Sequence, residues 1–397
     1  MRCRPILLVP ALFIAAACGV DRPLAVTEIS SANLALSQAE GSAPKFWETG
    51  ATVAWNAHAA TLLARRPSDA VRLLAYISLA QLRAAEAAEA TPGPHPPIFG
   101  AIGGASAAML RAFFPLDVAD IDAWLAAQAA APEWPGAKHQ DFAAGEAIGR
   151  AIAARVVVFA RGDNAGLTNP GVPPIGPGRW AYVTGGPIAR GGYGSRPFFL
   201  TSGNQFLPEA PPVFGSPEYL AALAVVRQIS DTRTAAQLAV AQYWNTNASP
   251  RNADGMNGIA RRLIVERRRG DAAAARMMFL MNASMFDAAI GCFHAKFTYW
   301  YIRPSQADPL ITLPIGLPPH PSYPSGHSCV TGAATGILAG LFPSEARYLD
   351  SVADEAGLSR LYGGIHYSFD MMAGRALGRS VAELALGSDL SAVAPLP

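Results

Sequence analysis

Three short polar clusters between Lys296 and Asp370 constrain the fold of this 397-residue chain more than any other feature of its sequence. The clusters are residues 296–304, 320–327 and 359–370. Together they supply three cations, a serine hydroxyl, a glycine amide, two histidines and a carboxylate, and no packing requirement explains them. A fold that gathers the clusters creates a site that can surround a tetrahedral oxyanion and carry out proton transfer or nucleophilic chemistry on it.

The composition around these clusters favours helices. Hydrophobic residues make up 51% of the chain, and alanine dominates them, with leucine and arginine also frequent. The 33 prolines and 37 glycines gather between patches of helical periodicity, where they mark turns and loops. We find no alternation typical of strands and no internal repeat, so the sequence predicts an all-α protein.

Apolar spacing sets the expected helices and loops. Ser68 is expected to cap the second helix, and Pro304 to break the long helix that carries Lys296 just after Arg303. Residues 162–216, rich in glycine, proline and aromatic side chains, are expected to form a long loop that is functional or packed around a site. The expected helices cover about residues 46–66, a stretch after Ser68 that includes 71–82, and then 102–113, 117–130, 137–161, 217–229, 233–244, 252–268, 271–300, 325–341, 344–356 and 369–386.

The first 18 residues are typical of an export signal. Arg2 and Arg4 precede an apolar run over residues 6–17, which is too short to span a membrane. The small residues before Cys18 resemble a bacterial lipoprotein processing site, except that Ala15 stands where a larger aliphatic residue is usual. Lipidation of Cys18 and ordinary cleavage nearby therefore both stay open. In either case we expect an exported protein, periplasmic or at the cell surface, that meets the membrane only through its N-terminus.

We expect residues 1–18 to be a signal peptide, of the ordinary or the lipoprotein type, residues 19–42 to form a flexible linker and residues 43–390 to form one domain. Removal of the leader takes two of the 31 basic residues, and the 29 that remain balance the 29 acidic residues. A neutral chain argues against a nucleic-acid binder, which needs a basic face. After the leader, no segment reaches about 18 uninterrupted apolar residues, the length that a membrane-spanning helix needs.

Two cysteines, Cys292 and Cys329, lie near the first and second clusters. They could form a disulfide in an oxidising compartment, or they could be two buried thiols, and the sequence leaves open whether they pair. The cysteine spacing does not match a metal-binding motif.

The first two clusters contain features that can bind an anion. Ser325, Gly326 and His327 follow a proline at an expected helix N-terminus, where unpaired backbone N–H groups attract anions; an ordinary helix cap is the alternative. Lys296 and Arg303 are seven residues apart, so a continuous helix would place both near one face. That face would be an anion site or a solvated basic surface.

The third cluster pairs a histidine with a carboxylate. Asp370 follows His366 by four residues, and on the first turn of a helix its carboxylate can accept a hydrogen bond from one ring nitrogen. This bond fixes the tautomer and leaves the other nitrogen as a nucleophile or ligand; the alternative is a core histidine with a satisfied partner. Arg360 precedes His366 by six residues, across a Gly-Gly pair that permits a tight turn.

Taken together, the three clusters resemble one family. Lys-x6-Arg-Pro over 296–304, Pro-Ser-Gly-His over 324–327 and Ser-Arg-x5-His-x3-Asp over 359–370 match, in order and spacing, the motifs of the superfamily of vanadium-dependent haloperoxidases and type 2 phosphatidic acid phosphatases (PAP2). The flanking sequence, including residues 196–200, is similar to the soluble bacterial haloperoxidase-like branch. The resemblance implies a helical bundle of the haloperoxidase and acid phosphatase type, with its active-site motifs within 296–370.

The resemblance also implies residue roles. His366 would bond to vanadium as the metal ligand, or attack phosphorus, and Asp370 would orient it. His327 would be the acid–base group, and Lys296 would polarise a bound peroxide, which completes the catalytic set. The residues that would hold the oxygens of vanadate or phosphate are Lys296, Arg303, Ser325, Gly326 and Arg360, together with His366.

The motifs fit two reactions. A haloperoxidase would use one vanadate per chain and hydrogen peroxide to convert halide to hypohalous acid, which attacks an organic acceptor. An acid phosphatase would hydrolyse a phosphate ester through a phospho-histidine at His366, without a cofactor. His320 resembles the histidine of bromide-using members, and the chain lacks the spans of membrane-bound lipid phosphatases, so we predict a haloperoxidase that favours bromide over chloride. A surface lipoprotein that binds oxyanions without turnover is the third hypothesis, and relatives commonly form homodimers.

Overall fold

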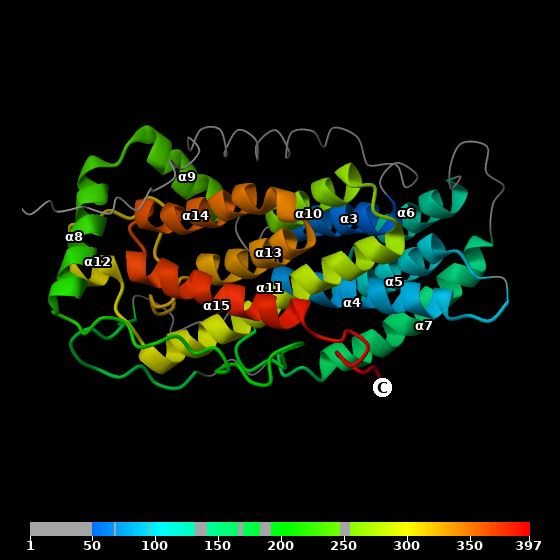
Figure 1. The fold of residues 1–397 in the computed structure, drawn as a ribbon, viewed down its shortest axis with the longest axis horizontal. Helices are drawn as coiled ribbons and strands as arrows, with labels where there is room; N and C mark the ends of the chain where they lie inside the picture. Colours follow the sequence, from blue (N-terminus) through cyan, green and yellow to red (C-terminus); the bar gives the residue numbers. More distant parts are fainter. Residues whose placement is uncertain are drawn as a thin grey trace, which may run out of the picture.

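The computed structural model describes residues 50–66, 69–93, 95–131, 141–165, 170–182, 192–246 and 255–397. The secondary structure of these residues is helical, with one isolated antiparallel bridge between Arg179 and Tyr301 (Figure 1). The all-α class predicted from composition and periodicity is therefore confirmed.

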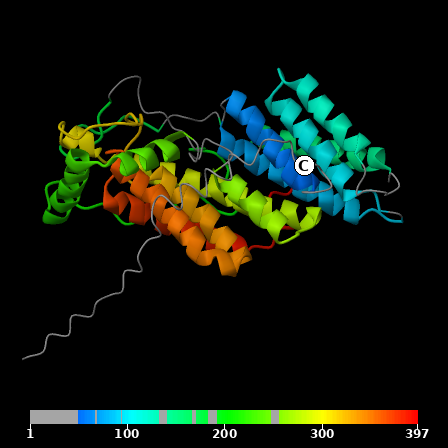
Figure 2. The same ribbon diagram turned by 90° about the horizontal axis from the view of Figure 1, so that it is seen from above.

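The described helices form an N-terminal group and a C-terminal group, which lie on different sides of the molecule in Figure 2. The first group contains α3 (Ala51–Arg65), α4 (Ala70–Glu89), α5 (Ile98–Phe113), α6 (Val118–Ala130) and α7 (Phe142–Arg161). The later helices are α8 (Pro217–Thr232), α9 (Ala235–Thr246), α10 (Gly255–Glu266), α11 (Asp271–Tyr299), α12 (Pro304–Ala307), α13 (Gly326–Leu341), the 3₁₀ helix η1 (Pro343–Glu345), α14 (Ala346–Tyr362) and α15 (Ser368–Leu386).

Helix α11 joins the two groups. Its apolar residues are spread around the whole helix, and almost every side chain from Met278 to Phe297 is buried. A helix without a polar face needs partners on all sides. α11 accordingly packs on α4 of the first group and on α13 and α15 of the second (Figure 1). Its C-terminal end therefore delivers the first polar cluster to the helices that carry the other two.

Glycines permit two close helix crossings. A Cβ atom on Gly149 of α7 would lie 1.9 Å from the carbonyl oxygen of Ala101 on α5, inside the N-terminal group. A Cβ atom on Gly374 of α15 would lie 2.6 Å from the carbonyl oxygen of Ser325, the N-cap of α13. Neither position accepts a side chain unless the backbone moves. The second crossing brings the second and third polar clusters together.

The predicted helices are present, with differences at their ends. The N-cap of α4 is Asp69, whose side chain accepts from the backbone N–H of Arg72, and the predicted cap, Ser68, lies outside the described residues. Carboxylate and hydroxyl caps are interchangeable in sequence, so neighbouring Ser and Asp residues are easily confused. α14 continues to Tyr362, six residues beyond the predicted end at 356, because no proline or left-handed glycine interrupts it earlier.

The described part of the predicted long loop is irregular and packs on the helices. The buried carboxylate of Asp287 on α11 accepts hydrogen bonds from the backbone N–H groups of Phe198, Phe199 and Leu200 at 2.7–2.9 Å. Further along, the loop supplies three backbone carbonyls that accept from tyrosine hydroxyls outside it. Tyr299 donates to Pro208, Tyr301 to Pro212 and Tyr323 to Glu209. The loop is thus held against the segments that carry the first two clusters.

Several predictions about the N-terminus fall on residues that the structure does not describe. The export signal, Cys18 and the linker 19–42 lie outside the described ranges. Among the helices that are described, none has the length and apolar character needed to cross a membrane. Cys292 and Cys329 are both described, and both are buried free thiols.

Candidate active site

The first cluster begins with Lys296, on the last turn of α11. Its side chain is fully buried, and burial lowers the pKa of its ammonium group to about 8. The ammonium donates to the backbone carbonyls of Pro321 and Ser322, at 2.9 and 2.8 Å, and to that of Pro324. An ammonium group has three N–H donors, so the loop of the second cluster uses all of them.

Arg303 does not share a helix face with Lys296, which corrects the prediction from their spacing. α11 ends at Tyr299, where Trp300 takes a left-handed φ of +47°. The chain then turns, and Arg303 becomes the N-cap of α12, with Pro304 at the first helical position. The fixed φ of proline suits a helix start, so Pro304 begins a new helix and does not mark the end of the old one.

The buried guanidinium of Arg303 nevertheless connects all three clusters. It donates to the backbone carbonyl of Ile365 at 2.6 Å and to Nε2 of His366 at 3.0 Å. On its other side it donates to the carbonyl and to Nδ1 of His320, both at 3.0 Å. Burial lowers its pKa to about 10, which still leaves it charged at neutral pH.

His366 and Asp370 are in contact, in a geometry that differs from the predicted one. α15 begins at Ser368 with Tyr367 as its N-cap, so His366 precedes the helix. Oδ2 of Asp370 accepts from the backbone N–H of Tyr367 at 3.1 Å and from Nδ1 of His366 at 2.8 Å. One carboxylate oxygen therefore both caps the helix and orients the histidine ring.

The partners of His366 fix its tautomer. A guanidinium can only donate, so Nε2 accepts from Arg303, and Nδ1 carries the proton that Asp370 accepts. Burial, reinforced by the positive charges of Arg303 and Lys296, holds the pKa of His366 well below its usual range. Burial raises the pKa of Asp370 to about 6. At neutral pH the pair is thus a neutral histidine and an ionised carboxylate, with the lone pair of Nε2 directed toward the cations.

Arg360, on the last turn of α14, completes a set of three buried cations. It donates to the hydroxyl of Ser359 at 2.8 Å and to the carbonyl of Ala241 at 2.9 Å. Burial and the nearby charge of Arg303 lower its pKa to about 9. Within the described residues, no ion pair joins Lys296, Arg303 or Arg360 to a carboxylate. The site therefore has an excess of buried positive charge, which an anion would neutralise.

The second cluster forms a helix N-terminus, as predicted. Ser325 is the N-cap of α13, its hydroxyl accepts from the N–H of Ser328, and Gly326 is the first helical residue. The backbone N–H of Ser325 donates to the carbonyl of Asp370 at 2.9 Å. Nε2 of His327 donates to the carbonyl of Trp244, at the end of α9, at 2.9 Å.

His320, the predicted halide-site residue, lies beside the cation cluster. It is half-buried, its Nδ1 accepts from Arg303, and its ring packs edge-on against Phe293 at a centroid distance of 5.2 Å. Its position is set by the loop before α13, whose carbonyls also hold Lys296. The structure thus brings all the predicted site residues within the described part of the chain to one end of the C-terminal helix group.

Sequence reasoning missed three contributors to the site. Ala241 and Trp244 supply their carbonyls from α9, and a backbone carbonyl leaves no trace in the sequence. Ser322 lies within the second cluster, where its sequence context gives it no role, yet its hydroxyl donates to Oδ2 of Asp370 at 2.5 Å. The signal that could have found it is its place inside a motif, immediately before the Tyr-Pro that leads into the Ser-Gly-His of α13.

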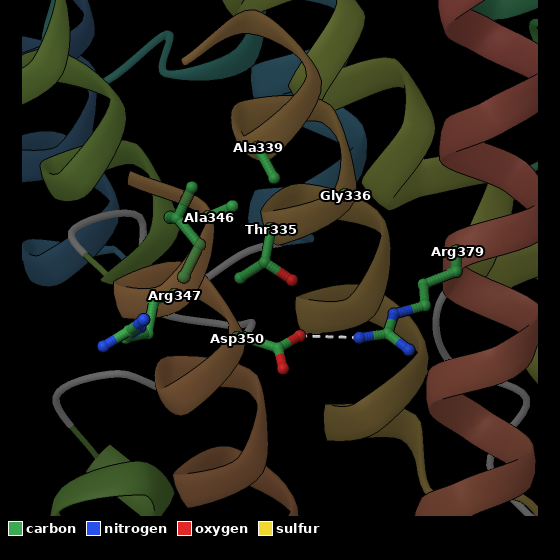
Figure 3. A pocket seen from close by; sticks show the side chains of 8 residues that line it. Thr335, Gly336, Ala339, Ala346, Arg347, Asp350 and Arg379 are labelled. Carbon is green, nitrogen blue, oxygen red and sulfur yellow. Dashed lines mark hydrogen bonds and ion pairs between the residues drawn. The ribbon is translucent and has the colours of Figure 1, made fainter. Parts of the chain in front are cut away.

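A surface pocket of about 300 Å³ lies away from these residues (Figure 3). Gly336 and Ala339 of α13 and Leu349 of α14 contribute apolar surface to it. Arg379 of α15 donates to the carboxylate of Asp350 at 2.6 Å, and Figure 3 shows this pair at its edge. None of the motif residues lines this pocket, so it is separate from the site built by the three clusters.

Comparison with known proteins finds similarity to the same superfamily that the three motifs resemble. Residues 277–388 match the PAP2 superfamily. The fold is similar to that of a bacterial vanadium-dependent iodoperoxidase, with a TM-score of 0.68 and 23% identity over 84% of this chain and 94% of the other. It is also similar to a bacterial vanadium-dependent chloroperoxidase: the apo form has a TM-score of 0.62 and 13% identity over 80% and 94% of the two chains, and the holo form 0.60 and 15% over 82% and 90%. A search of curated protein sequences found no match.

These likenesses confirm the family resemblance that the three motifs indicated. The match to the PAP2 superfamily supports an enzyme, and the solved structures show the fold. Residues 277–388 match the PAP2 superfamily, and the chain that contains them has the fold of the bacterial vanadium haloperoxidases.

Proposed function

We propose that this protein is a vanadate-dependent haloperoxidase, which uses hydrogen peroxide to oxidise halide to hypohalous acid. The observation that supports it best is the environment of His366. Its unprotonated Nε2 lies among three buried cations, while Asp370 holds the opposite nitrogen. Such an arrangement suits a ligand to the central atom of an oxyanion whose outer oxygens are bound by N–H donors.

The donor set fits vanadate. Lys296, Arg303 and Arg360 are buried without carboxylate partners in the described part of the chain, so a bound anion would offset a charge that is otherwise costly. Bound vanadate would supply a Lewis-acidic centre that activates peroxide for oxygen transfer to halide. The remaining oxygen contacts would come from the hydroxyl of Ser325 and the backbone N–H of Gly326, at the start of α13.

Binding an anion requires the residues of the site to exchange hydrogen bonds. The N–H of Arg303 that now donates to Nε2 of His366 would donate to an oxygen of the anion instead. This change would free the lone pair of Nε2. Lys296 would give up one carbonyl acceptor of the loop before α13 and direct that N–H to the anion. Transfer of the proton on Nε2 of His327 requires this N–H to leave the carbonyl of Trp244.

Two considerations favour the haloperoxidase over the phosphatase. The fold is shared with vanadium haloperoxidases over 80–84% of this chain, which includes the N-terminal helices, whereas the match to the PAP2 superfamily covers residues 277–388. His320 is in direct contact with Arg303, where it could influence the halide. We therefore keep bromide as the favoured halide over chloride, and include iodide in the test because it is the most easily oxidised of the three.

The test is peroxide-dependent bromination of a phenolic dye by the purified protein, with and without added orthovanadate, beside hydrolysis of a phosphate monoester. Bromination that appears only with vanadate and is lost in His366→Ala would support the proposal. Turnover of the phosphate ester alone, inhibited by vanadate, would show a phosphatase that uses His366 as its nucleophile. Parallel assays with iodide and chloride would establish the halide order.

A third outcome is vanadate binding without either activity. His327→Ala separates this case from an enzyme, because an oxyanion carrier needs only the N–H donors of the site. In a carrier, the affinity for vanadate should be unchanged by the substitution. In an enzyme, affinity should be largely retained, while turnover falls by about 10²–10⁴-fold through loss of the acid–base group.

Export, through the segment that ends near Cys18, is part of this proposal. Its products, hypohalous acids, react with many cellular components, so release outside the cytoplasm suits the chemistry. The mass of the N-terminal peptide of the mature protein would distinguish a lipidated Cys18 from ordinary cleavage nearby. Sedimentation of the mature protein would test the expected homodimer.

A further inference from the structure

We propose that Ser322 is a positioning residue, which fixes the carboxylate of Asp370 and thereby the ring of His366, and couples both to Lys296. Its hydroxyl donates to Oδ2 of Asp370 at 2.5 Å, and both side chains are fully buried. The importance of this coupling for turnover rests on the proposed function; the coupling itself rests on the contacts of these residues.

The carboxylate of Asp370 depends on few donors. Oδ2 accepts from the hydroxyl of Ser322, from the backbone N–H of Tyr367 and from Nδ1 of His366. Oδ1 is buried and has no hydrogen-bond partner among the described residues. Removal of the Ser322 hydroxyl would leave a buried carboxylate with two donors, one of which is the histidine that it must orient. Rotation of the carboxylate would then cost little, because Oδ1 and Oδ2 would be more nearly equivalent.

Ser322 itself is fixed by its backbone. Its N–H donates to the carbonyl of Tyr301 at 2.9 Å, and its carbonyl accepts from the ammonium of Lys296 at 2.8 Å. The flanking residues Pro321 and Tyr323 are buried as well, so the segment cannot turn as a unit. The hydroxyl is therefore held where it meets Asp370, and a chain of hydrogen bonds runs from Lys296 through Ser322 and Asp370 to His366.

This chain of hydrogen bonds explains how the relative orientation of Lys296 and His366 is set, which the anion-binding donors by themselves do not explain. Lys296 and His366 are not hydrogen-bonded to each other in the described structure, yet both must keep a defined orientation around the same oxyanion. A residue whose carbonyl holds the cation and whose hydroxyl holds the partner of the histidine sets their relative positions. Groups that orient a ligating histidine in this way typically contribute 10–100-fold to affinity or activity.

The test uses Ser322→Ala with Ser322→Thr as the conservative variant, since threonine keeps the hydroxyl. Ser284→Ala is the matched control, because the Ser284 hydroxyl is equally buried in α11 but has no hydrogen-bond partner in the described structure. The first readout is the ¹⁵N spectrum of histidine-labelled protein without vanadate at one fixed pH. The chain has seven histidines, and His366→Ala identifies the signals of His366.

We expect the wild-type protein, Ser322→Thr and Ser284→Ala to show a single His366 tautomer with its proton on Nδ1. Ser322→Ala should show a mixture of tautomers or an exchange-broadened ring signal. Unchanged His366 signals in Ser322→Ala would overturn the proposal, whatever the enzyme activity. This readout does not depend on the proposed function, so its failure is distinguishable from failure of the haloperoxidase assay.

The second readout separates orientation from binding. The affinity for inorganic phosphate, measured by calorimetry, should change by less than about threefold in Ser322→Ala, because the three cations stay in place, while turnover falls by about 10–100-fold. A parallel loss of phosphate affinity and turnover would indicate a merely structural role and would contradict the proposal. If Ser322→Ala does not fold, Ser322→Cys takes its place, because its thiol is a weaker donor than a hydroxyl. We expect this variant to show smaller changes in the His366 tautomer signal and in turnover.

Discussion

The structure contains two buried polar clusters that differ in the number of their cations: the first has one arginine, and the second has a lysine and two arginines. One lies between α3, α4, α10 and α11 and consists of Asn56, Ser78, Asn257, Arg261 and Asn282. We call it the asparagine network. The other is the candidate active site at the C-terminal end of α11. Sequence position alone does not distinguish them, since both combine residues from distant segments.

The asparagine network satisfies its members with one another. Asn257 and Asn282 exchange side-chain hydrogen bonds at 2.9 and 3.1 Å, and Asn56 donates to Asn257 at 2.9 Å. Oδ1 of Asn56 accepts from Arg261 at 2.8 Å, and Asn282 also donates to Ser78 at 3.1 Å. Amide groups carry both donors and acceptors, so a set of them can close without a ligand.

The candidate active site cannot close in this way. Lysine and arginine side chains only donate, and the backbone carbonyls that accept from them carry no net charge. The carboxylate of Asp370, which contacts the motif side chains, is already engaged by His366 and Ser322. Burial of polar groups by itself is therefore a poor sign of function, whereas burial of three cations around a single carboxylate indicates a place for an anion.

The sharpest test of this comparison removes one central member of each cluster. His366→Ala should lower vanadate-dependent bromination by more than about 10³-fold, with little change in thermal unfolding. Asn282→Ala should leave the activity of the folded protein unchanged but reduce the free energy of unfolding by about 1–3 kcal/mol, because the buried amide of Asn257 loses its partner. Equal effects of the two variants on activity would contradict the distinction between the clusters.

The second prediction is that removal of one buried cation weakens anion binding but does not lower the stability of the anion-free protein. Arg360→Leu should weaken phosphate or vanadate binding by about 10–100-fold, since a charge-assisted donor is lost. In the absence of anion it should leave the protein as stable as the wild type or more stable, by about 1 kcal/mol, because an unbalanced buried charge is removed. Arg261→Leu, in the asparagine network, should destabilise the protein, because Asn56 loses a donor. Chemical denaturation and calorimetry measure both quantities.

The third prediction is a pH dependence. Lys296 has a pKa of about 8 without anion, so the affinity for phosphate should fall by up to about tenfold per pH unit above pH 8 as this cation loses its proton. Stability should change in the opposite sense. Between about pH 8 and 10.5 the unfolded chain binds more protons than the folded one at this group, so its contribution to stability rises with pH.

The control for the pH prediction is Lys296→Met. This variant should bind phosphate more weakly at pH 7 and should lack the part of the decline that begins near pH 8. A decline of the same size in both proteins would assign it to another group, such as Arg360, whose pKa of about 9 is the next in order. Calorimetric titrations between pH 6.5 and 9.5 are sufficient.

The smallest expected effect is on halide choice. His320→Phe should shift the ratio of kcat/KM for bromide and chloride toward chloride by about tenfold, which corresponds to a change in a single side-chain contact. Because Nδ1 of His320 accepts from Arg303, overall activity should also fall somewhat. A halide ratio that stays the same would remove His320 from the halide site and leave it as a support for Arg303.

Local sequence patterns predicted much of the fold. Helical periodicity and proline punctuation located the helices, and the Pro-Ser-Gly-His motif located the N-terminus of α13. The errors lie where tertiary contacts override local spacing. Lys296 and Arg303 are seven residues apart, but the turn at Trp300 takes Arg303 out of α11, and His366 meets Asp370 across a helix cap and not along a helix.

The sequence by itself determined the chemistry that the site can offer. Residue types fix which groups donate, accept or carry charge, so three cations, two histidines and a carboxylate within 75 residues already indicated an oxyanion site. Only the tertiary structure decided how these groups are used. Side-chain acids and bases acquire their tautomers and pKa values from neighbours and burial, and the carbonyls of Ala241, Trp244 and Ser322 that hold Arg360, His327 and Lys296 belong to the backbone, which every sequence has in common.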